Sequence, residues 1–305
     1  MAGEFEQYDD RFKKLTLGNV HLDHLASGCR WAEGAVYMAA GKYLLWSDAP
    51  NDRVLRYDET NGAISNFLQP ANYHNGHTTD RQGRLIACEH GGRCISRIEH
   101  DGTRRVLADR FQGKRFNSPN DVVVKSDGSI WFSDPTYGID TDYEGHASKA
   151  EIGGSYVYRL DPDSGEATAV ATDFVQPNGL AFSPDEKRLY IADTGATHVD
   201  NGPHHIRVAE LGADGRSLGP AKLFAECTDG LFDGFRIDTE GNLWTSAGDG
   251  VHVYAPDGTL IGKIKVPEVV ANLCFGGPKR NRLFICATTS LYAIYVNARP
   301  AGWPA

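Results

Sequence analysis

The sequence contains no apolar stretch long enough to cross a membrane. Its first ten residues, Met1–Asp10, also lack the apolar core of a signal peptide. From these two absences we expect a cytoplasmic protein that has no membrane partner.

Basic residues are too few for a surface that binds nucleic acid. The chain of 305 residues has 31 Lys and Arg against 40 Asp and Glu, which gives a formal net charge of −9. Because affinity for nucleic acid depends on basic contacts with phosphate, we expect no nucleic-acid partner. The acidic excess leaves carboxylates for a cation site.

The cysteines show no metal-ligand spacing, and several familiar motifs are missing. We interpret the six cysteines as reduced, buried thiols, because most lie in or beside apolar runs. They are Cys29, Cys88, Cys94, Cys227, Cys274 and Cys286. The absence of a P-loop, a dinucleotide glycine fingerprint, a nucleophile elbow and a zincin motif removes the usual evidence for nucleotide cofactors and serine nucleophiles.

What the sequence does contain is a polar residue that recurs at the head of a short apolar run. The heads are Glu33, Asn75, Asn120, Asn178, Asp233 and Asn272. They are 42, 45, 58, 55 and 39 residues apart, a spacing typical of propellers and solenoids. Each head begins a run that meets a turn and a second run, as in Asn120–Asp134, which is a hairpin signature.

A third and a fourth run follow in most units, so the pattern predicts an all-β fold, a six-bladed β-propeller with four antiparallel strands per blade. The last unit has no outer strand after Val296, and we expect Val20–Leu25 to supply it and close the ring. A chain of this length fits one closed all-β domain, residues 1–305. Residues 1–18 would then be an N-terminal extension and 297–305 a C-terminal tail.

In such a blade the first strand starts on the face where the second strand ends. The heads should therefore share one end of a central channel with the acidic ends of the second strands, such as Asp134. The long connections Asp134–Gly154 and Asp193–His205 leave from the same face, and loops of this length are often binding loops or lids. We expect the functional site on this face.

The side chains of the heads predict a metal site. Glu33 and Asp233 offer carboxylates, and Asn120 and Asn178 offer amide oxygens. An all-oxygen set suits one divalent cation in the channel, with calcium preferred, magnesium or manganese as alternatives, and zinc least suited. Asp233 can be both a ligand and the general base, because coordination leaves one carboxylate oxygen free.

Five segments resemble the senescence marker protein/gluconolactonase/luciferin-regenerating enzyme family, and most closely its bacterial gluconolactonases. They are Glu33–Tyr37, Asn117–Asp121, Trp131–Gly138, Pro177–Leu180 and Asp233–Asp238. The resemblance spans roughly Gly28 to Val296. It implies a six-bladed propeller, a divalent metal held by Glu33, Asn120, Asn178 and Asp233, and hydrolysis of a sugar lactone. It also implies Arg115 and Asn117 as the residues that hold substrate hydroxyls.

The role of the remaining candidates is open at this point. Asn75 could contact substrate, but both Asn75 and Asn272 could instead bind backbone at the channel mouth. Asp134 could bind a sugar hydroxyl or cap its own turn.

The leading hypothesis is a metal-dependent lactonase acting on D-glucono-1,5-lactone or a similar sugar lactone as its small-molecule partner. A promiscuous esterase or phosphotriesterase is the second hypothesis, and a non-catalytic binding propeller with a structural metal is the third. The oligomeric state is left open.

Overall fold

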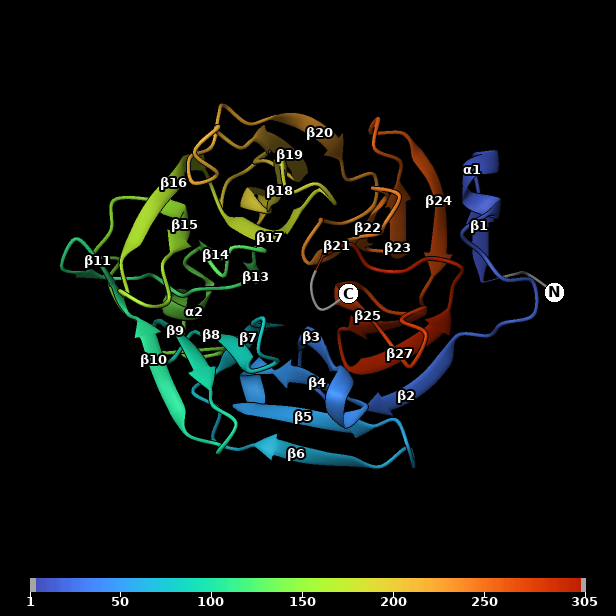
Figure 1. Ribbon diagram of the computed structural model, residues 1–305, viewed down its shortest axis with the longest axis horizontal. Helices are drawn as coiled ribbons and strands as arrows, with labels where there is room; N and C mark the ends of the chain where they lie inside the picture. The colour runs from blue at the N-terminus through green and yellow to red at the C-terminus, as the bar shows by residue number, and fades with distance from the viewer. Residues whose placement is uncertain (1–3, 303–305) are drawn as a thin grey trace.

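The computed structural model describes residues 4–302 and confirms the predicted propeller. Six sheets, five with four antiparallel strands and one with five, surround a common axis (Figure 1). In each blade the first strand in sequence lies nearest the axis, except that the sixth blade takes its outermost strand from the N-terminal part of the chain. Each innermost strand contacts the innermost strands of both neighbouring blades, which closes the ring around the channel.

The strands follow the hairpin and third-run pattern that the sequence predicted. Written from the inner to the outer strand of each blade, they are β3 (Ala32–Met38), β4 (Tyr43–Asp48), β5 (Arg53–Asp58) and β6 (Ile64–Leu68); β7 (His74–Thr79), β8 (Leu85–Glu89), β9 (Cys94–Ile98) and β10 (Arg104–Ala108); β13 (Val122–Val124), β14 (Ile130–Asp134), β15 (Ser155–Leu160) and β16 (Ala167–Phe174); β17 (Pro177–Phe182), β18 (Arg188–Asp193), β19 (His205–Glu210) and β20 (Lys222–Glu226); β21 (Phe235–Ile237), β22 (Leu243–Ala247), β23 (Gly250–Tyr254) and β24 (Leu260–Lys265); β25 (Val270–Gly276), β26 (Arg282–Ala287), β27 (Ser290–Tyr295) and β2 (Asp23–Ser27).

The ring closes as predicted, with an N-terminal strand on the last blade. That strand is β2, which pairs antiparallel with β27, and Asp23 lies opposite Ala293. It begins three residues later than the expected Val20, because Val20 and Leu22 pack against the hydrophobic core instead of joining the ladder. A closure of this kind ties the two ends of the chain into one sheet.

The segment before β2 also has defined structure. β1 (Phe5–Gln7) adds a fifth strand to blade five by pairing with β24. The short helix α1 (Asp10–Lys13) then buries Phe12 against the sheet, where a Cβ atom on Gly262 would come within 2.2 Å of the Phe12 ring. The sequence did not predict these elements, and residues 1–3 of the expected extension lie outside the described residues.

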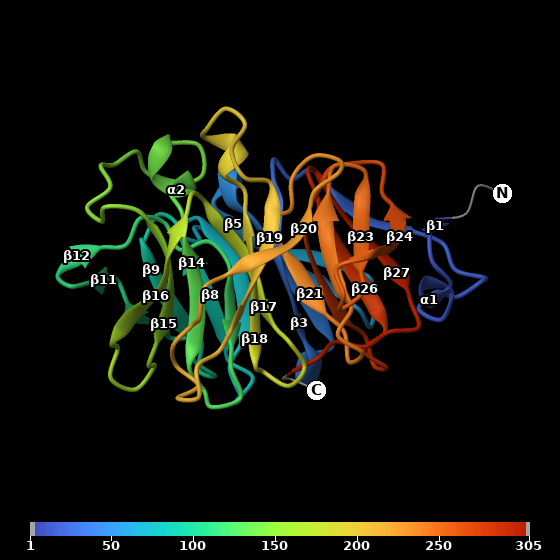
Figure 2. The ribbon, with the colours of Figure 1, turned by 90° about the horizontal axis from the view of Figure 1, so that it is seen from above.

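The C-terminal tail crosses the channel axis. Ala301 donates its backbone N–H to Ile237 O, and Pro300 forms an isolated bridge with Asp238. Pro300, Ala301 and Gly302 line a cavity together with Val36 of β3, Val123 of β13 and Phe182 of β17, and the helix α2 (Tyr137–Asp140) lies on the opposite face (Figure 2). The described part of the tail therefore covers one mouth of the channel, while residues 303–305 lie outside the described range.

The short elements lie in the loops. They are the hairpin β11 (Arg110–Phe111) and β12 (Lys114–Arg115), and the 3-10 turns η1 (Ala39–Gly41), η2 (Ala49–Asn51) and η3 (Gly195–Thr197). α2 and η3 belong to the two long connections after β14 and β18, and both rise on the same face (Figure 2).

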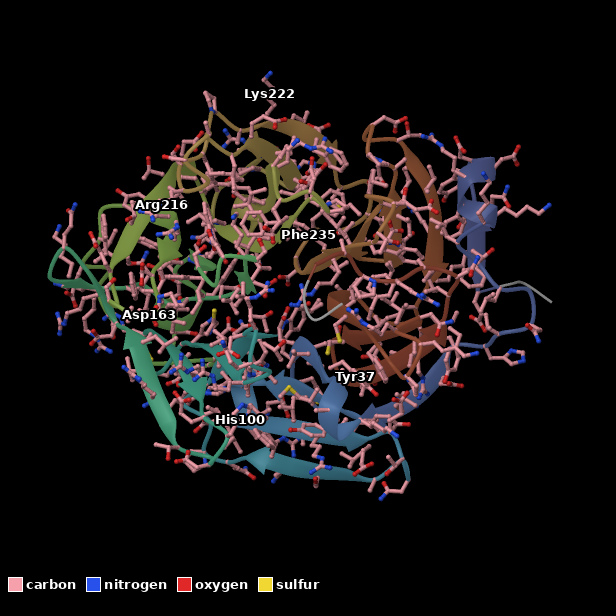
Figure 3. The ribbon with its side chains drawn as sticks, viewed as in Figure 1. Tyr37, His100, Asp163, Arg216, Lys222 and Phe235 are labelled. Carbon is pink, nitrogen blue, oxygen red and sulfur yellow. The ribbon has the colours of Figure 1, made fainter. Side chains whose placement is uncertain are left out.

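The core fills the space between the blades. Trp46, Trp131 and Trp244 all come from second strands and are fully buried. Figure 3 shows the contrast between inner and outer strands: Phe235 of β21 lies near the axis, and Lys222 of β20 points out at the rim. All six cysteines are free and buried, as expected. Within residues 4–302, no helix has the length and apolar character required to cross a membrane.

Candidate metal centre and active site

A cavity of about 340 Å³ lies on the face that carries the long loops. Five of the six recurring heads line it, because each stands where its innermost strand starts. They are Glu33, Asn75, Asn120, Asn178 and Asp233. The other lining residues are Trp31, Tyr137, Glu144, Thr194, Thr197, Gly230, Leu231, Gly248, Val269 and Val270. The four predicted metal ligands therefore converge on one cavity.

Glu33 presents one free carboxylate oxygen. Its Oε2 accepts hydrogen bonds from the backbone N–H of Gly34 at 2.6 Å and from Asn272 Nδ2 at 2.8 Å. Its Oε1 is buried and has no hydrogen-bond partner among the described residues. Gly34 is required here, since its φ is +59° and a Cβ atom would lie 1.9 Å from Asn75 O. Two donors thus fix the carboxylate and leave Oε1 for a cation.

Asn178 is oriented in a similar way. Its Nδ2 donates to Thr194 Oγ1 at 3.2 Å, while its Oδ1 is buried without a partner. Asp233 is positioned through its backbone, whose N–H donates to Ser246 Oγ at 2.7 Å. Asn120 is held likewise by a bond from its backbone N–H to Ser133 O at 2.9 Å. The unpartnered oxygens of Glu33 and Asn178 are the atoms that a hard cation would satisfy.

The electrostatics of the cavity also favour a cation. Burial raises the pKa of Glu33 to about 7, and the nearby charge of Asp121 adds to the rise. The pKa of Asp233 is raised well above its usual value by burial and by the charge of Glu33. None of the lining residues is Lys, Arg or His. Two carboxylates that lie close together without a basic partner are stabilised in their charged form by a bound cation.

The donor set fits a divalent cation with oxygen ligands. Within residues 4–302 no group of three or more His, Cys, Asp or Glu is arranged to hold a metal. The predicted set is of another kind, with two carboxylates and two amides, and amide oxygens are ordinary ligands of calcium.

Comparison with known proteins identifies the family of this chain. Residues 31–289 match the model of the SMP-30/Gluconolactonase/LRE-like region. The chain belongs to this family. This confirms the resemblance seen in the sequence.

Several members of the family are similar over nearly the whole chain. A gluconolactonase of Zymomonas mobilis is 30% identical over 315 residues, which cover 96% of this chain and 86% of the relative. The pentonolactonase XacC of Haloferax volcanii is 31% identical over 265 residues, covering 85% and 82%. A solved gluconolactonase from Xanthomonas campestris has 37% identity and a TM-score of 0.89, covering 96% of this chain and 94% of that chain.

Two of the six recurring heads, Asn75 and Asn272, were not predicted to bind the metal, and their surroundings differ. Asn272 does not line the cavity, because its Nδ2 is bound to Glu33 and its Oδ1 accepts the backbone N–H of Leu273. Asn75 lines the cavity, and its Nδ2 lies 3.2 Å from His90 Nε2. Asn272 thus orients the carboxylate of Glu33, a predicted ligand, and Asn75 lines the cavity itself.

The other three predicted substrate contacts are not among the residues that line the cavity. Arg115 lies in the outer hairpin and donates from Nη2 to Gly92 O. Asn117 donates from Nδ2 to Asp134 O and Gly154 O, and its backbone N–H donates to Asp134 Oδ2. Both Asn117 and Asp134 are fully buried, so they join the loop to the end of β14. This matches the turn-capping alternative for Asp134.

Sequence reasoning missed several lining residues. Tyr137, Thr194 and Thr197 form a hydroxyl cluster, with Tyr137 Oη 2.6 Å from Thr194 Oγ1 and 3.0 Å from Thr197 Oγ1. Trp31 and Glu144 were also not singled out as site residues. The available signal was the length of the two loops, which marked this face but not the individual side chains.

Proposed function

We propose that this protein is a divalent-metal-dependent lactonase that hydrolyses a sugar lactone, such as D-glucono-1,5-lactone, to the aldonate. The observation that carries the proposal is the convergence of Glu33, Asn120, Asn178 and Asp233 on one cavity, with unpartnered oxygens on Glu33 and Asn178. The family membership and the names of its similar members support lactone hydrolysis. Calcium as the ion and the cytoplasm as the location belong to the same proposal.

The residues of the cavity have two roles in the proposed reaction, metal binding and general-base catalysis. A divalent cation held by these four side chains would polarise the lactone carbonyl and stabilise the negative charge that develops on its oxygen. Asp233 is the general base that takes a proton from the attacking water, because its carboxylate lies at the cavity surface. The water oxygen bonds to the carbonyl carbon, the ring C–O bond breaks, and the ring oxygen leaves as a hydroxyl after protonation.

The second candidate function is a promiscuous esterase or phosphotriesterase at the same site. One wall of the cavity is apolar and is formed by Trp31, Leu231, Val269 and Val270. Such a wall accepts the apolar C–H face of a sugar ring, and it also accepts an aromatic or alkyl ester. Among the aromatic residues, Tyr137 lines the cavity, whereas Trp46 and Phe116 are fully buried and are not among the lining residues.

Metal removal tests the proposal. Protein stripped with a chelator should release no acid from glucono-1,5-lactone above the spontaneous rate, and calcium, magnesium or manganese should restore turnover. The measurement is acid release in a pH-stat, with circular dichroism to confirm that the stripped protein stays folded. Full activity of the stripped protein would contradict metal dependence. Turnover of aryl esters or phosphotriesters without turnover of the lactone would favour the second candidate.

Thr194 should matter for metal binding although it is not proposed as a ligand. Thr194→Val removes the acceptor that orients the Asn178 amide, so we expect metal affinity to fall by about tenfold or more. Isothermal titration with calcium measures this effect. Thr197→Val is the matched control, because Thr197 contacts Tyr137 but no proposed ligand. Equal calcium affinities for the two variants would show that Thr194 does not determine the orientation of the Asn178 amide.

A further inference from the structure

His90 connects two residues that line the cavity, Asn75 and Glu144, by a contact to each of them. It follows β8 and is fully buried. Its Nε2 lies 3.2 Å from Asn75 Nδ2, and its Nδ1 lies 3.0 Å from the backbone oxygen of Glu144. Asn75 belongs to the inner strand β7, whereas Glu144 belongs to the long connection after α2 on the upper face in Figure 2.

The two partners of His90 determine its hydrogens. The backbone oxygen of Glu144 can only accept, so Nδ1 carries the hydrogen. The amide nitrogen of Asn75 can only donate, so Nε2 is unprotonated and accepts. A neutral ring satisfies both contacts, and burial accordingly lowers the pKa of His90 to about 4. The Asn75 amide is thereby fixed with its nitrogen toward His90 and its oxygen away from it.

The loop that carries Glu144 is closely packed against His90. A Cβ atom on Gly138 would lie 2.4 Å from His90 Cβ, and one on Gly145 would lie 2.0 Å from Gly138 O. His146 donates its backbone N–H to Gly138 O at 3.0 Å, which closes the loop on itself. Glu144 is therefore held at a fixed place on the cavity wall.

Two hydrogen-bond acceptors of the cavity are left without a donor. Among the described residues, no side chain or backbone N–H donates to the Asn75 Oδ1 or to the Glu144 carboxylate. His90 Nδ1 lies 3.9 Å from that carboxylate and already donates to the backbone oxygen of Glu144. Tyr137, Thr194 and Thr197, which carry hydroxyl groups, line the same cavity. Hydroxyl groups of a ligand are the donors that such a pair of acceptors would bind.

We propose that Asn75 and Glu144 form a subsite for substrate hydroxyl groups and that His90 is the positioning residue that holds both, so that the site selects polyhydroxylated lactones over unsubstituted ones. The inference rests on the proposed lactonase function and specifies its substrate class. It assigns recognition of the hydroxyl groups to the wall formed by β7 and the long loop, apart from the ligands that hold the metal.

The test compares two lactones with the same six-membered ring. Glucono-1,5-lactone carries hydroxyl groups, and δ-valerolactone carries none. His90→Phe keeps an aromatic ring but removes both hydrogen bonds. We expect it to raise KM for glucono-1,5-lactone about tenfold or more, with kcat within about twofold and with kcat/KM for δ-valerolactone within about twofold.

Three further variants make the result specific. Glu144→Ala should reproduce the selective loss without disturbing the core. His90→Gln offers an acceptor to Asn75 and should recover part of the KM. His146→Phe is the matched control in the same loop, since its ring packs on Tyr73 outside the cavity, and it should leave both lactones unchanged.

Each outcome bears on a different proposal. An equal loss for both lactones in His90→Phe and Glu144→Ala would show a general structural role and overturn the inference, while the lactonase proposal would stand. No change for either lactone would overturn it as well. Failure of the unsubstituted protein to hydrolyse either lactone with any metal would overturn the lactonase proposal and the inference together.

Discussion

Asp233→Asn is expected to lower kcat for glucono-1,5-lactone by about a thousandfold or more at saturating metal. The change keeps the size and shape of the side chain but removes a carboxylate from a cavity that has only Glu33 and Glu144 as other acidic lining residues. Loss of the base removes the proton acceptor for the attacking water. Loss of the charge also weakens the hold on the cation.

Two measurements separate these two effects. Titration with calcium gives the change in metal affinity, and acid release at saturating metal gives the change in kcat. A large fall in kcat at full metal occupancy identifies Asp233 as the base, whereas a fall in affinity with normal kcat at saturation would assign it only to metal binding. Asp214→Asn is the matched control, because that carboxylate caps an exposed turn by accepting the backbone N–H of Ser217. A kcat above about a tenth of normal in Asp233→Asn, together with an unchanged affinity for calcium, would rule out both roles.

Glu89→Gln is expected to reduce the free energy of unfolding at neutral pH by about 3 kcal/mol. Glu89 ends β8 and is fully buried. Arg104 donates to it from Nε and Nη2 at 2.7 and 2.6 Å, and His74 Nε2 lies 3.4 Å away. Removing the carboxylate charge breaks the ion pair that compensates the Arg104 guanidinium at this buried end of β8.

The contacts of His74 extend the network of Glu89 toward the cavity. His77 donates its Nδ1–H to Gly34 O at 2.8 Å, and its Nε2 lies 3.1 Å from His74 Nδ1. Nε2 of His74 in turn faces the Glu89 carboxylate at 3.4 Å. The network thus runs from Arg104 at the outer strand to the turn that begins with Glu33.

The pH dependence of stability follows from the pKa of Glu89. Burial by itself raises this pKa, but the hydrogen bonds from His74 and Arg104 outweigh burial and lower it to about 2 from 4.5. A carboxyl whose pKa is lower in the folded state contributes stability above the unfolded pKa and loses it as pH falls through the folded pKa. We therefore expect about 3 kcal/mol from this group to disappear between about pH 5 and pH 2.

Urea unfolding of both proteins across this pH range is the measurement. The difference in stability between the unsubstituted protein and Glu89→Gln should be largest near neutral pH and shrink toward pH 2. Glu99→Gln is the control, because Glu99 pairs with Arg84 and Arg97 at a partly exposed position, and we expect a loss below about 1 kcal/mol. A difference for Glu89→Gln that does not change with pH would show that the pKa is not lowered.

The sequence predicted the repeat, and it predicted that the four proposed ligands share one cavity, because both follow from local patterns. Alternating apolar runs and turns determine strands wherever they occur, and identical topology in each unit places every head at the same end of its inner strand. Glu33 and Asn178 could therefore be assigned to one site although they lie 145 residues apart in the chain. The closing strand was predicted by the same reasoning, from the missing outer strand of the last blade.

The roles of Arg115, Asn117, His90 and Glu144 depended on the tertiary structure. Proximity in sequence suggested that Arg115 and Asn117 would face substrate, but β12 turns Arg115 to the outside and Asn117 is used to hold the loop after β14. His90 and Glu144 carry no local signal, because the roles proposed for them rest on a contact across 54 residues. By itself the sequence determined the blades and predicted the oxygen ligands, since both follow from periodicity and residue chemistry. Only the tertiary structure decided which loops cover the cavity, because long irregular segments have no periodic pattern and are positioned by packing against other blades.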